Sequence, residues 1–245
     1  MSIRRFTRTL GLSTLLLASG CAPTKVQSVQ TYAGPALPRP QLVVVNDFST
    51  DAADVTLDSG IGARVKTAIM GAPANQEALT ARKATDAISL TLVKEIDKLG
   101  LPVIRADAAS ATSGNRLIIG GKINSIDEGN RTRRNFIGFG AGKSEVDATA
   151  AVYYQGIGET APRLVRTFDG LAQSGRKPGA AGMLGAGAAA GRLATAAVTN
   201  TGASIASETM NAGVDDDSER MAKELAAQLK KFFADQGWIP RSATQ

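Results

Sequence analysis

The chain has no histidine, one cysteine and only 4% aromatic residues among its 245 residues. Histidine is the commonest general base and a frequent metal ligand, so its absence excludes a Ser-His-Asp triad and any histidine-ligated metal site. A single cysteine excludes a disulfide within the chain. Carboxylate or lysine chemistry remains open, but the composition favours a protein that is not an enzyme and needs neither a metal nor a cofactor.

The chain also lacks an apolar run long enough to span a bilayer, although it begins with a short one. Arg4, Arg5 and Arg8 precede LGLSTLLLASG, which is shorter than the roughly 20 residues that a spanning helix requires. This order predicts an export signal over residues 1–20. Its removal would leave 25 basic and 22 acidic residues, because it holds three of the 28 cations and no acid, so the net charge would fall from +6 to +3. The basic composition is therefore weak evidence for nucleic acid, and we expect none as a partner.

The only cysteine, Cys21, directly follows the small residues Ala18, Ser19 and Gly20. This pattern is similar to the bacterial lipobox, where a diacylglycerol is attached to the thiol before the signal is cut away. The alternative is an ordinary secretory signal that leaves Cys21 as a lone thiol. We expect lipidation, because two or three acyl chains, palmitate among them, hold a protein on a membrane stably. The chain would then be anchored without spanning.

Residues 21–40 contain four of the nine prolines in the chain. Proline-rich stretches favour extended conformations with a rise of about 3.1 Å per residue. The composition predicts a tether over residues 21–40 that holds a folded domain tens of ångströms from the membrane.

The folded domain is predicted over residues 41–237 and begins with the valine-rich strand QLVVVNDF. Apolar residues from Ala81 to Leu99 then recur at helical spacing, and Gly100 and Pro102 end the helix. LPVIRAD supplies a second strand. This order predicts a β-α-β unit with parallel strands.

Three further strands are predicted in NRLIIGGKINSIDEG, SEVDATAAVYYQ and PRLVRTFDGLAQ, which follow one another as antiparallel hairpins. A final helix starts near Asp215, Asp216 and Asp217, has an apolar stripe that includes Met221 and Leu225, and ends at Gly237. We therefore expect an α/β domain with one mixed sheet of about five strands, packed helices, a C-terminal helix and a tail over residues 238–245.

The segment Gly138–Ser144, GFGAGKS, has the appearance of a phosphate-binding loop. Such a loop needs a glycine five residues before Gly142, where this chain has Ile137, and it must open a helix. The residues after Ser144 alternate between apolar and polar, which predicts a strand instead. We therefore expect a glycine-rich connection between two strands and no nucleotide at Lys143.

The order of VVVNDF, LPVIRAD, LIIGGKINSIDEGN and the block from Arg131 to Ser144 resembles the family known as domain of unknown function 4410. The resemblance implies a bacterial lipoprotein, and with Ala22 after the cysteine it implies sorting to the outer membrane. It brings no activity, cofactor or catalytic residue.

The segment GNRTRRNFIGFGAGK gathers Arg131, Arg133, Arg134 and Lys143 in one loop. Clustered guanidinium groups favour phosphate and carboxylate, so the loop is a candidate site for lipid headgroups, an anionic cell-wall polymer or an acidic envelope protein. The alternative is a solvated turn whose charges keep a glycine-rich loop soluble.

Four carboxylates flank this loop. Without histidine they make a weak metal or acid-base site, and Glu145 and Asp147 lie on the polar face of an alternating strand. We expect all four to be exposed to solvent: Asp127, Glu128, Glu145 and Asp147.

Residues 179–207 are dominated by glycine and alanine, with Gly187 and Gly191 spaced as in a helix-association motif. A membrane element is one interpretation, but Arg192 would be costly at the centre of a bilayer. We expect an Ala-rich helix that docks on the sheet.

Two hypotheses for the function follow. The first is a non-enzymatic, lipid-anchored envelope protein that acts as a binding or assembly module facing the periplasm. The second is a nucleotide-binding or carboxylate-dependent hydrolase that uses the GFGAGKS loop.

Overall fold

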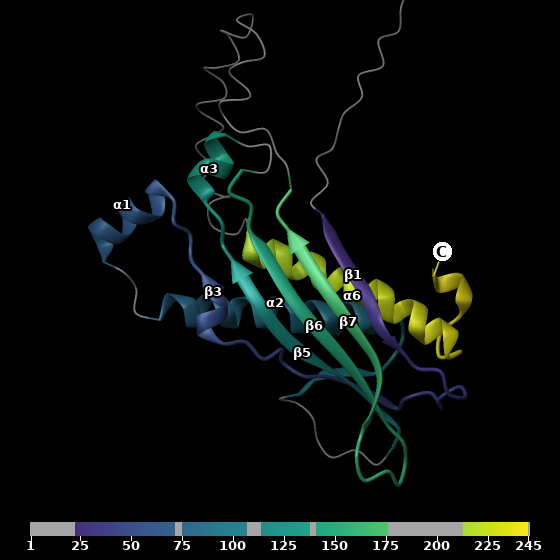
Figure 1. Cartoon of the computed structure of the whole chain (residues 1–245). Helices are drawn as coiled ribbons and strands as arrows, with labels where there is room; N and C mark the ends of the chain where they lie inside the picture. The colour runs from purple at the N-terminus through teal and green to yellow at the C-terminus, as the bar shows by residue number, and fades with distance from the viewer. Residues whose placement is uncertain (1–22, 72–74, 107–113, 138–140, 176–212, 245) are drawn as a thin grey trace, which may run out of the picture.

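The computed structural model describes residues 23–71, 75–106, 114–137, 141–175 and 213–244. Over these ranges the chain forms an open sheet that is covered on one face by two long helices (Figure 1). The strands are β1 (Thr24–Thr31), β2 (Leu42–Val45), β3 (Val55–Thr56), β4 (Val103–Arg105), β5 (Arg116–Asp127), β6 (Glu145–Gln155) and β7 (Arg163–Gln173). The helices are α1 (Ile61–Met70), α2 (Gln76–Asp97), α3 (Arg131–Phe136) and α6 (Val214–Asp235), with short 3-10 turns η1 (Ala52–Asp54) and η3 (Arg241–Thr244).

The sheet is mixed, with strand order β1-β7-β6-β5-β2-β4 and β3 paired to β5. Strand β2 runs parallel to both β4 and β5, whereas β5, β6, β7 and β1 follow one another antiparallel. The predicted α/β class, the parallel β-α-β start, the hairpins and the C-terminal helix are confirmed. Among the described residues the sheet has seven strands, so the predicted number of about five is too small.

The core lies between the sheet and helices α2 and α6, which pack against each other. Helix α2 contributes Ile88, Leu92 and Ile96, all fully buried, at the spacing that places them on one helical face. Strand β6 buries every second residue, from Val146 to Tyr154, as its alternating sequence predicts. Local periodicity therefore accounts for the central layer of the fold.

The opposite face of the hairpin strands carries a row of polar side chains. Asn124 donates to Asp147 at 2.6 Å and to Thr149 at 3.1 Å, and Thr149 lies 3.2 Å from Asp169. Cross-strand polar pairs of this kind suit a sheet face that is in contact with water.

The predicted tether requires a correction, because Thr24–Thr31 forms the edge strand β1, antiparallel to β7. Beyond it Leu37 is buried, and its amide donates to Gln236 Oε1 at 2.7 Å. Only Val26 of β1 is buried, so the strand has almost no apolar signature. The folded domain starts at about residue 24 instead of residue 41.

The predicted C-terminal tail also requires a correction. Trp238 and Ile239 are buried in the core, and the indole Nε1 of Trp238 donates to the carbonyl of Leu37 at 2.8 Å. The indole also stacks on Tyr154, with 6.3 Å between the ring centroids. The chain on both sides of the predicted 41–237 boundaries therefore belongs to the folded unit.

Residues 1–20, Cys21 and the segment 179–207 lie outside the described residues. Across the ranges that are described, no helix is both long enough and apolar enough to cross a membrane.

Candidate functional site

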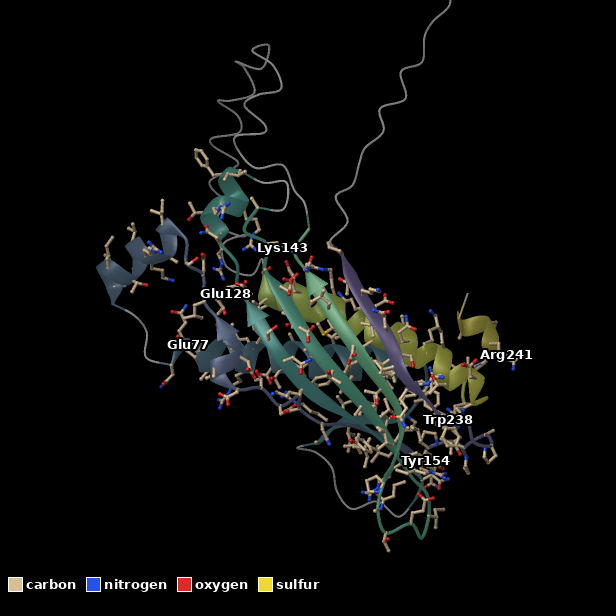
Figure 2. The ribbon with its side chains drawn as sticks, viewed as in Figure 1. Glu77, Glu128, Lys143, Tyr154, Trp238 and Arg241 are labelled. Carbon is tan, nitrogen blue, oxygen red and sulfur yellow. The ribbon has the colours of Figure 1, made fainter. Side chains whose placement is uncertain are left out.

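The predicted site residues gather at one end of the sheet, where β5 and β7 end and β1 and β6 begin. We call this the α3 end. Figure 2 shows Glu128 and Lys143 at this end, and Tyr154 and Trp238 at the opposite one. Helices α1 and α3 both lie at the α3 end (Figure 1).

The connection from β5 to β6 turns on two glycines with positive φ, Gly129 at 69° and Gly142 at 71°. A Cβ on Gly142 would lie 2.3 Å from the carbonyl oxygen of Asn130, and one on Gly129 would lie 2.2 Å from that of Lys143. Only glycine fits both requirements. The glycine of the apparent phosphate motif therefore closes a tight turn between two strands.

The prediction of a strand after Ser144 is confirmed, since β6 begins at Glu145. The ammonium of Lys143 donates to Gln173 Oε1 at 2.7 Å and lies 3.8 Å from Glu145. The hydroxyl of Ser144 is buried and donates to Asp217 at 2.5 Å. Both polar side chains of the motif are thus engaged with the protein itself. Gly138 and its two successors lie outside the described residues.

Arg131 lies against two carboxylates. Its Nε is 3.8 Å from Asp58 Oδ2, and its Nη2 is 3.9 Å from Glu128 Oε1. Asp58 also accepts the backbone amides of Gly60 and Arg131, at 2.8 Å and 3.3 Å. These contacts join the segment before α1 to the start of α3.

The expectation that Glu128 is exposed is wrong, because the residue is buried, with 8% of its surface accessible. Its two carboxylate oxygens accept from the Asp58 amide at 3.1 Å and from the Thr80 hydroxyl at 3.2 Å. A buried carboxylate needs such partners, because an unpaired charge in the interior is very costly. These partners lie 70 and 48 residues away in the sequence, so no local pattern indicates the burial.

The other three flanking carboxylates are more accessible. Asp127 is exposed and accepts the Gly129 amide at 2.7 Å. Glu145 and Asp147 are half-buried on the polar face of β6, and each accepts a side-chain amide, from Gln173 and Asn124 respectively. All are engaged in local hydrogen bonds.

The basic side chains of the loop differ in their surroundings. Arg134 is half-buried beside Ser174, with Nη1 at 3.4 Å from its hydroxyl, and burial together with the charge of Arg131 lowers its pKa. Arg133 is exposed, and no hydrogen bond or ion pair of its guanidinium is found within the described ranges. The four predicted cations are therefore brought to one end of the sheet, where Arg131, Arg134 and Lys143 contact different partners and Arg133 is exposed.

Asp217, in the first turn of α6, is the most deeply buried ionisable group of the α3 end. It is fully buried, and it accepts hydrogen bonds from Ser144 and from Arg220. Burial raises its pKa to about 6, against the opposing effects of Ser144, Arg220 and Arg134. In the sequence, Asp217 is one of three equivalent acids at a helix start, and only its packing sets it apart.

The N-terminal chain enters the fold at this same end. The carbonyl of Pro23 accepts the Gln173 amide at 3.0 Å, and Thr24 pairs with Ala172. Cys21 itself lies outside the described residues, two positions before Pro23.

A second feature, which the sequence predictions missed, is an open groove of about 530 Å³ between α2 and the loop after β2. Two of its lining residues, Asp47 and Asp86, accept hydrogen bonds from Arg105 at 2.6 Å and 2.5 Å, and the bond from Arg105 lowers the pKa of Asp47. The Thr50 hydroxyl oxygen is buried and has no hydrogen-bond partner among the described residues. The lining residues are Asp47, Phe48, Ser49, Thr50, Ala52, Ala78, Ala81, Arg82, Thr85 and Asp86.

The groove lies at the carboxyl end of β2, a strand that is flanked in the sheet by β4 and β5. Ligands of open α/β sheets commonly bind beyond such strand ends. The polar pair Asn46-Asp47 directly after a buried strand is the sequence signal that could have indicated it.

At the α3 end, carboxylates are paired with arginine and lysine side chains. No group of three possible metal-ligating side chains occurs in the portion of the chain that the structure describes. Asp58, Glu128 and Asp217 are each hydrogen-bonded to the fold, an arrangement that suits holding loops together.

Residues 43–191 match the family described as Domain of unknown function (DUF4410), which is more than half of the chain. No curated protein matches.

Among solved structures, the chain is similar to the PelC dodecamer from Paraburkholderia phytofirmans, with 15% identity over 63% of this chain and 86% of that chain, and a TM-score of 0.35. A single-residue variant of that dodecamer matches with 13% identity over 66% and 88%, and a TM-score of 0.33. Similarity at this level bears on neither the partner nor the assembly of the present chain.

Proposed function

The chain belongs to the DUF4410 family, and on this basis we propose that it is a lipid-anchored, non-enzymatic binding or assembly module of the bacterial envelope. It would face the periplasm from the outer membrane, held by acyl chains on Cys21. The sequence Ala18-Ser19-Gly20-Cys21 after an arginine-containing apolar segment supports the anchor.

The observation that carries this proposal is the hydrogen bond from Gln173 to the carbonyl of Pro23. Two residues of extended chain reach at most about 7 Å, so an acyl group on Cys21 would hold the α3 end close to the membrane. The opposite end would then remain available to a partner in the periplasm.

The engagement of the buried carboxylates supports a non-enzymatic role. A catalytic carboxylate must reach a substrate proton or a reacting carbon, whereas Glu128 and Asp217 are buried and hydrogen-bonded within the fold. The contacts of Lys143 and Ser144 with Gln173 and Asp217 likewise count against the nucleotide-binding alternative.

The partner in this proposal is an envelope protein or an anionic cell-wall or lipid component. Within the predicted basic loop, exposed Arg133 is the cation best placed to contact an anion, because Arg134 and Lys143 have partners in the fold. In the groove, the buried Thr50 hydroxyl and the Arg82 and Asp86 side chains would suit a polar segment of a partner.

The anchor is tested by labelling cells with a radioactive fatty acid. We expect label on the wild type and none on Cys21→Ser, with Ser19→Ala as a matched control that keeps the thiol. Label on both proteins, or on neither, contradicts the anchor.

The binding function is tested by crosslinking in intact cells, followed by purification and identification of what is attached. We expect one crosslinked partner to be lost in Thr50→Lys, which fills the groove, and kept in Thr31→Lys on the distant strand β1. For the hydrolase alternative, calorimetric titration with ATP and Mg²⁺ should give no heat of binding. Tight binding that Lys143→Ala abolishes would favour that alternative instead.

A further inference from the structure

Helix α1 presents an apolar stripe to solvent. Ile61, Val65 and Ile69 follow one another at intervals of four residues, which places them on one face of the helix. Their exposed fractions are 70%, 50% and 76%, and no residue of α1 is buried. An amphipathic helix normally turns such a stripe to the core, so this face lacks a partner among the described residues.

Basic residues flank the stripe on both sides. At 3.6 residues per turn, Arg64 lies beside one edge of the stripe and Lys66 beside the other. Both are exposed, and the sequence of α1, IGARVKTAIM, contains no acid. Helices with an apolar face and flanking cations are typical of those that lie in the headgroup region of a membrane.

A second exposed apolar pair lies next to this helix. Phe136 at the end of α3 is 66% exposed and Ile137 is 48% exposed. The two helices are joined at their starts by a 3.2 Å hydrogen bond from the Gly62 amide to the Thr132 hydroxyl, and they neighbour each other in Figure 1. Exposed Arg133 belongs to the same short helix.

The N-terminal chain is connected to this region by hydrogen bonds. Pro23 bonds to Gln173, Gln173 bonds to Lys143, and the carbonyl of Gly142 accepts the amide of Asn130, the N-cap residue of α3. The position from which an acylated Cys21 would enter the bilayer therefore lies at the same end of the molecule as both apolar patches.

We propose that the stripe of α1, together with Phe136 and Ile137, is a docking surface for an anionic lipid bilayer. Its apolar side chains lie at the boundary of the acyl chains, while Arg64, Lys66 and Arg133 contact the headgroups. The proposal deepens the proposed function and takes its orientation from the Cys21 anchor, although α1 itself needs no acyl group in order to bind lipid.

The charges beside the stripe favour contact with a bilayer over contact with a second copy of the chain. Two copies joined through this face would bring Arg64 and Lys66 toward their own equivalents, with no acid from α1 between them. Like charges placed opposite one another suppress such contacts. An anionic membrane surface instead favours each nearby cation by about fivefold in affinity.

The experiment uses the full-length protein, produced in bacteria with its signal, purified from membranes and reconstituted into vesicles of phosphatidylethanolamine and phosphatidylglycerol with brominated acyl chains. Val65→Trp places a fluorophore in the stripe. Ile157→Trp, at an exposed position between β6 and β7 at the other end of the sheet, is the matched control. The native Trp238 is buried and supplies a constant background.

We expect bromine to reduce the fluorescence of Val65→Trp and to leave Ile157→Trp and the wild type unchanged. The loss of fluorescence should diminish when phosphatidylcholine replaces the anionic lipid. It should also diminish when salt is raised to about 1 M, because charges more than about 3 Å apart are then largely screened. Bromine should reduce the fluorescence of Ile69→Trp as well. Agreement between the two variants would show that the result does not depend on one substituted position.

Equal fluorescence of Val65→Trp and Ile157→Trp in brominated vesicles overturns the docking proposal. A blue shift without bromine quenching also overturns it, because the face would then be covered by protein. Mass spectrometry of the same samples reports the acyl group on Cys21 separately. Quenching without an acyl group would thus reject the anchor and keep the docking surface, and an acyl group without quenching would do the reverse.

Discussion

The two ends of the sheet are closed by different chemistry. At the Trp238 end, the rings of Phe232 and Phe233 lie 5.4 Å and 5.6 Å from the Trp238 ring, and Tyr154 stacks beside it. At the α3 end, carboxylates and guanidinium groups close the fold around Glu128 and Asp217. Aromatic packing has little dependence on pH, whereas buried charge couples the fold to protonation. Packed rings therefore dominate one end of the sheet, and paired charges dominate the other.

The largest effect should come from removing the indole at the aromatic end. We expect Trp238→Ala to lower the free energy of unfolding by about 3–5 kcal/mol, because it leaves a cavity among three rings and frees the Leu37 carbonyl. Trp238→Phe keeps an aromatic ring, and should cost mainly the hydrogen bond, about 1 kcal/mol. Urea unfolding of both variants measures the difference. Equal losses in the two variants would contradict a role for ring packing at this end.

A smaller effect, present only over a range of pH, is expected at the α3 end. Burial raises the pKa of Asp217 from 3.8 to about 6, so the folded state holds a proton that the unfolded state releases. Protonated Asp217 therefore favours the folded state. The free energy of unfolding has its full value below about pH 4 and falls by up to about 3 kcal/mol as the pH rises through 6.

The variant Asp217→Asn cannot ionise and should lack this loss. Urea unfolding at intervals from pH 4 to pH 7 should show the wild type losing stability relative to the variant over that range. Trp238→Phe should follow the wild-type profile, since the substitution neither adds nor removes an ionisable group. Parallel profiles for wild type and Asp217→Asn would show that Asp217 does not couple folding to pH.

The smallest effect should separate two neighbouring cations of the α3 end. Arg134→Ala removes a half-buried side chain with a partner in Ser174 and should cost about 1–2 kcal/mol. Arg133→Ala changes an exposed side chain and should stay within about 0.5 kcal/mol of the wild type. Thermal unfolding of the two variants tests this, and equal stabilities would contradict the difference in burial.

Much of the sheet and both long helices could be predicted from the spacing of their apolar residues. These residues alternate with polar ones in the strands and recur every three to four positions in the helices. β6 and α2 are examples. Strand β1 could not, since an edge strand with one buried residue in TKVQSVQT carries almost no alternation. The burial of Trp238 depends on Leu37 and Tyr154, which are distant in sequence, so the chain after Gly237 had no local signal of a core.

The site was predictable in location but not in detail. Clustered arginines and glycines indicated the loop, and the glycines at 129 and 142 do form its turn. Which cations have partners could not be predicted, because Asp58, Ser174 and Gln173 reach the loop only through the fold. The exposed stripe of α1 has the same periodicity as a buried one, so the sequence alone cannot separate the two.

The attachment of β1 has a mechanical consequence. Its hydrogen bonds to β7 run across the strand, from Thr24 opposite Ala172 to Thr31 opposite Arg166. A tensile force applied to the chain before Pro23, directed along the strand axis, acts perpendicular to those bonds. It would load them in shear, all at once, whereas a force across the sheet would peel them one after another. The edge strand would thus transmit strain from its N-terminal end into β7 as a unit.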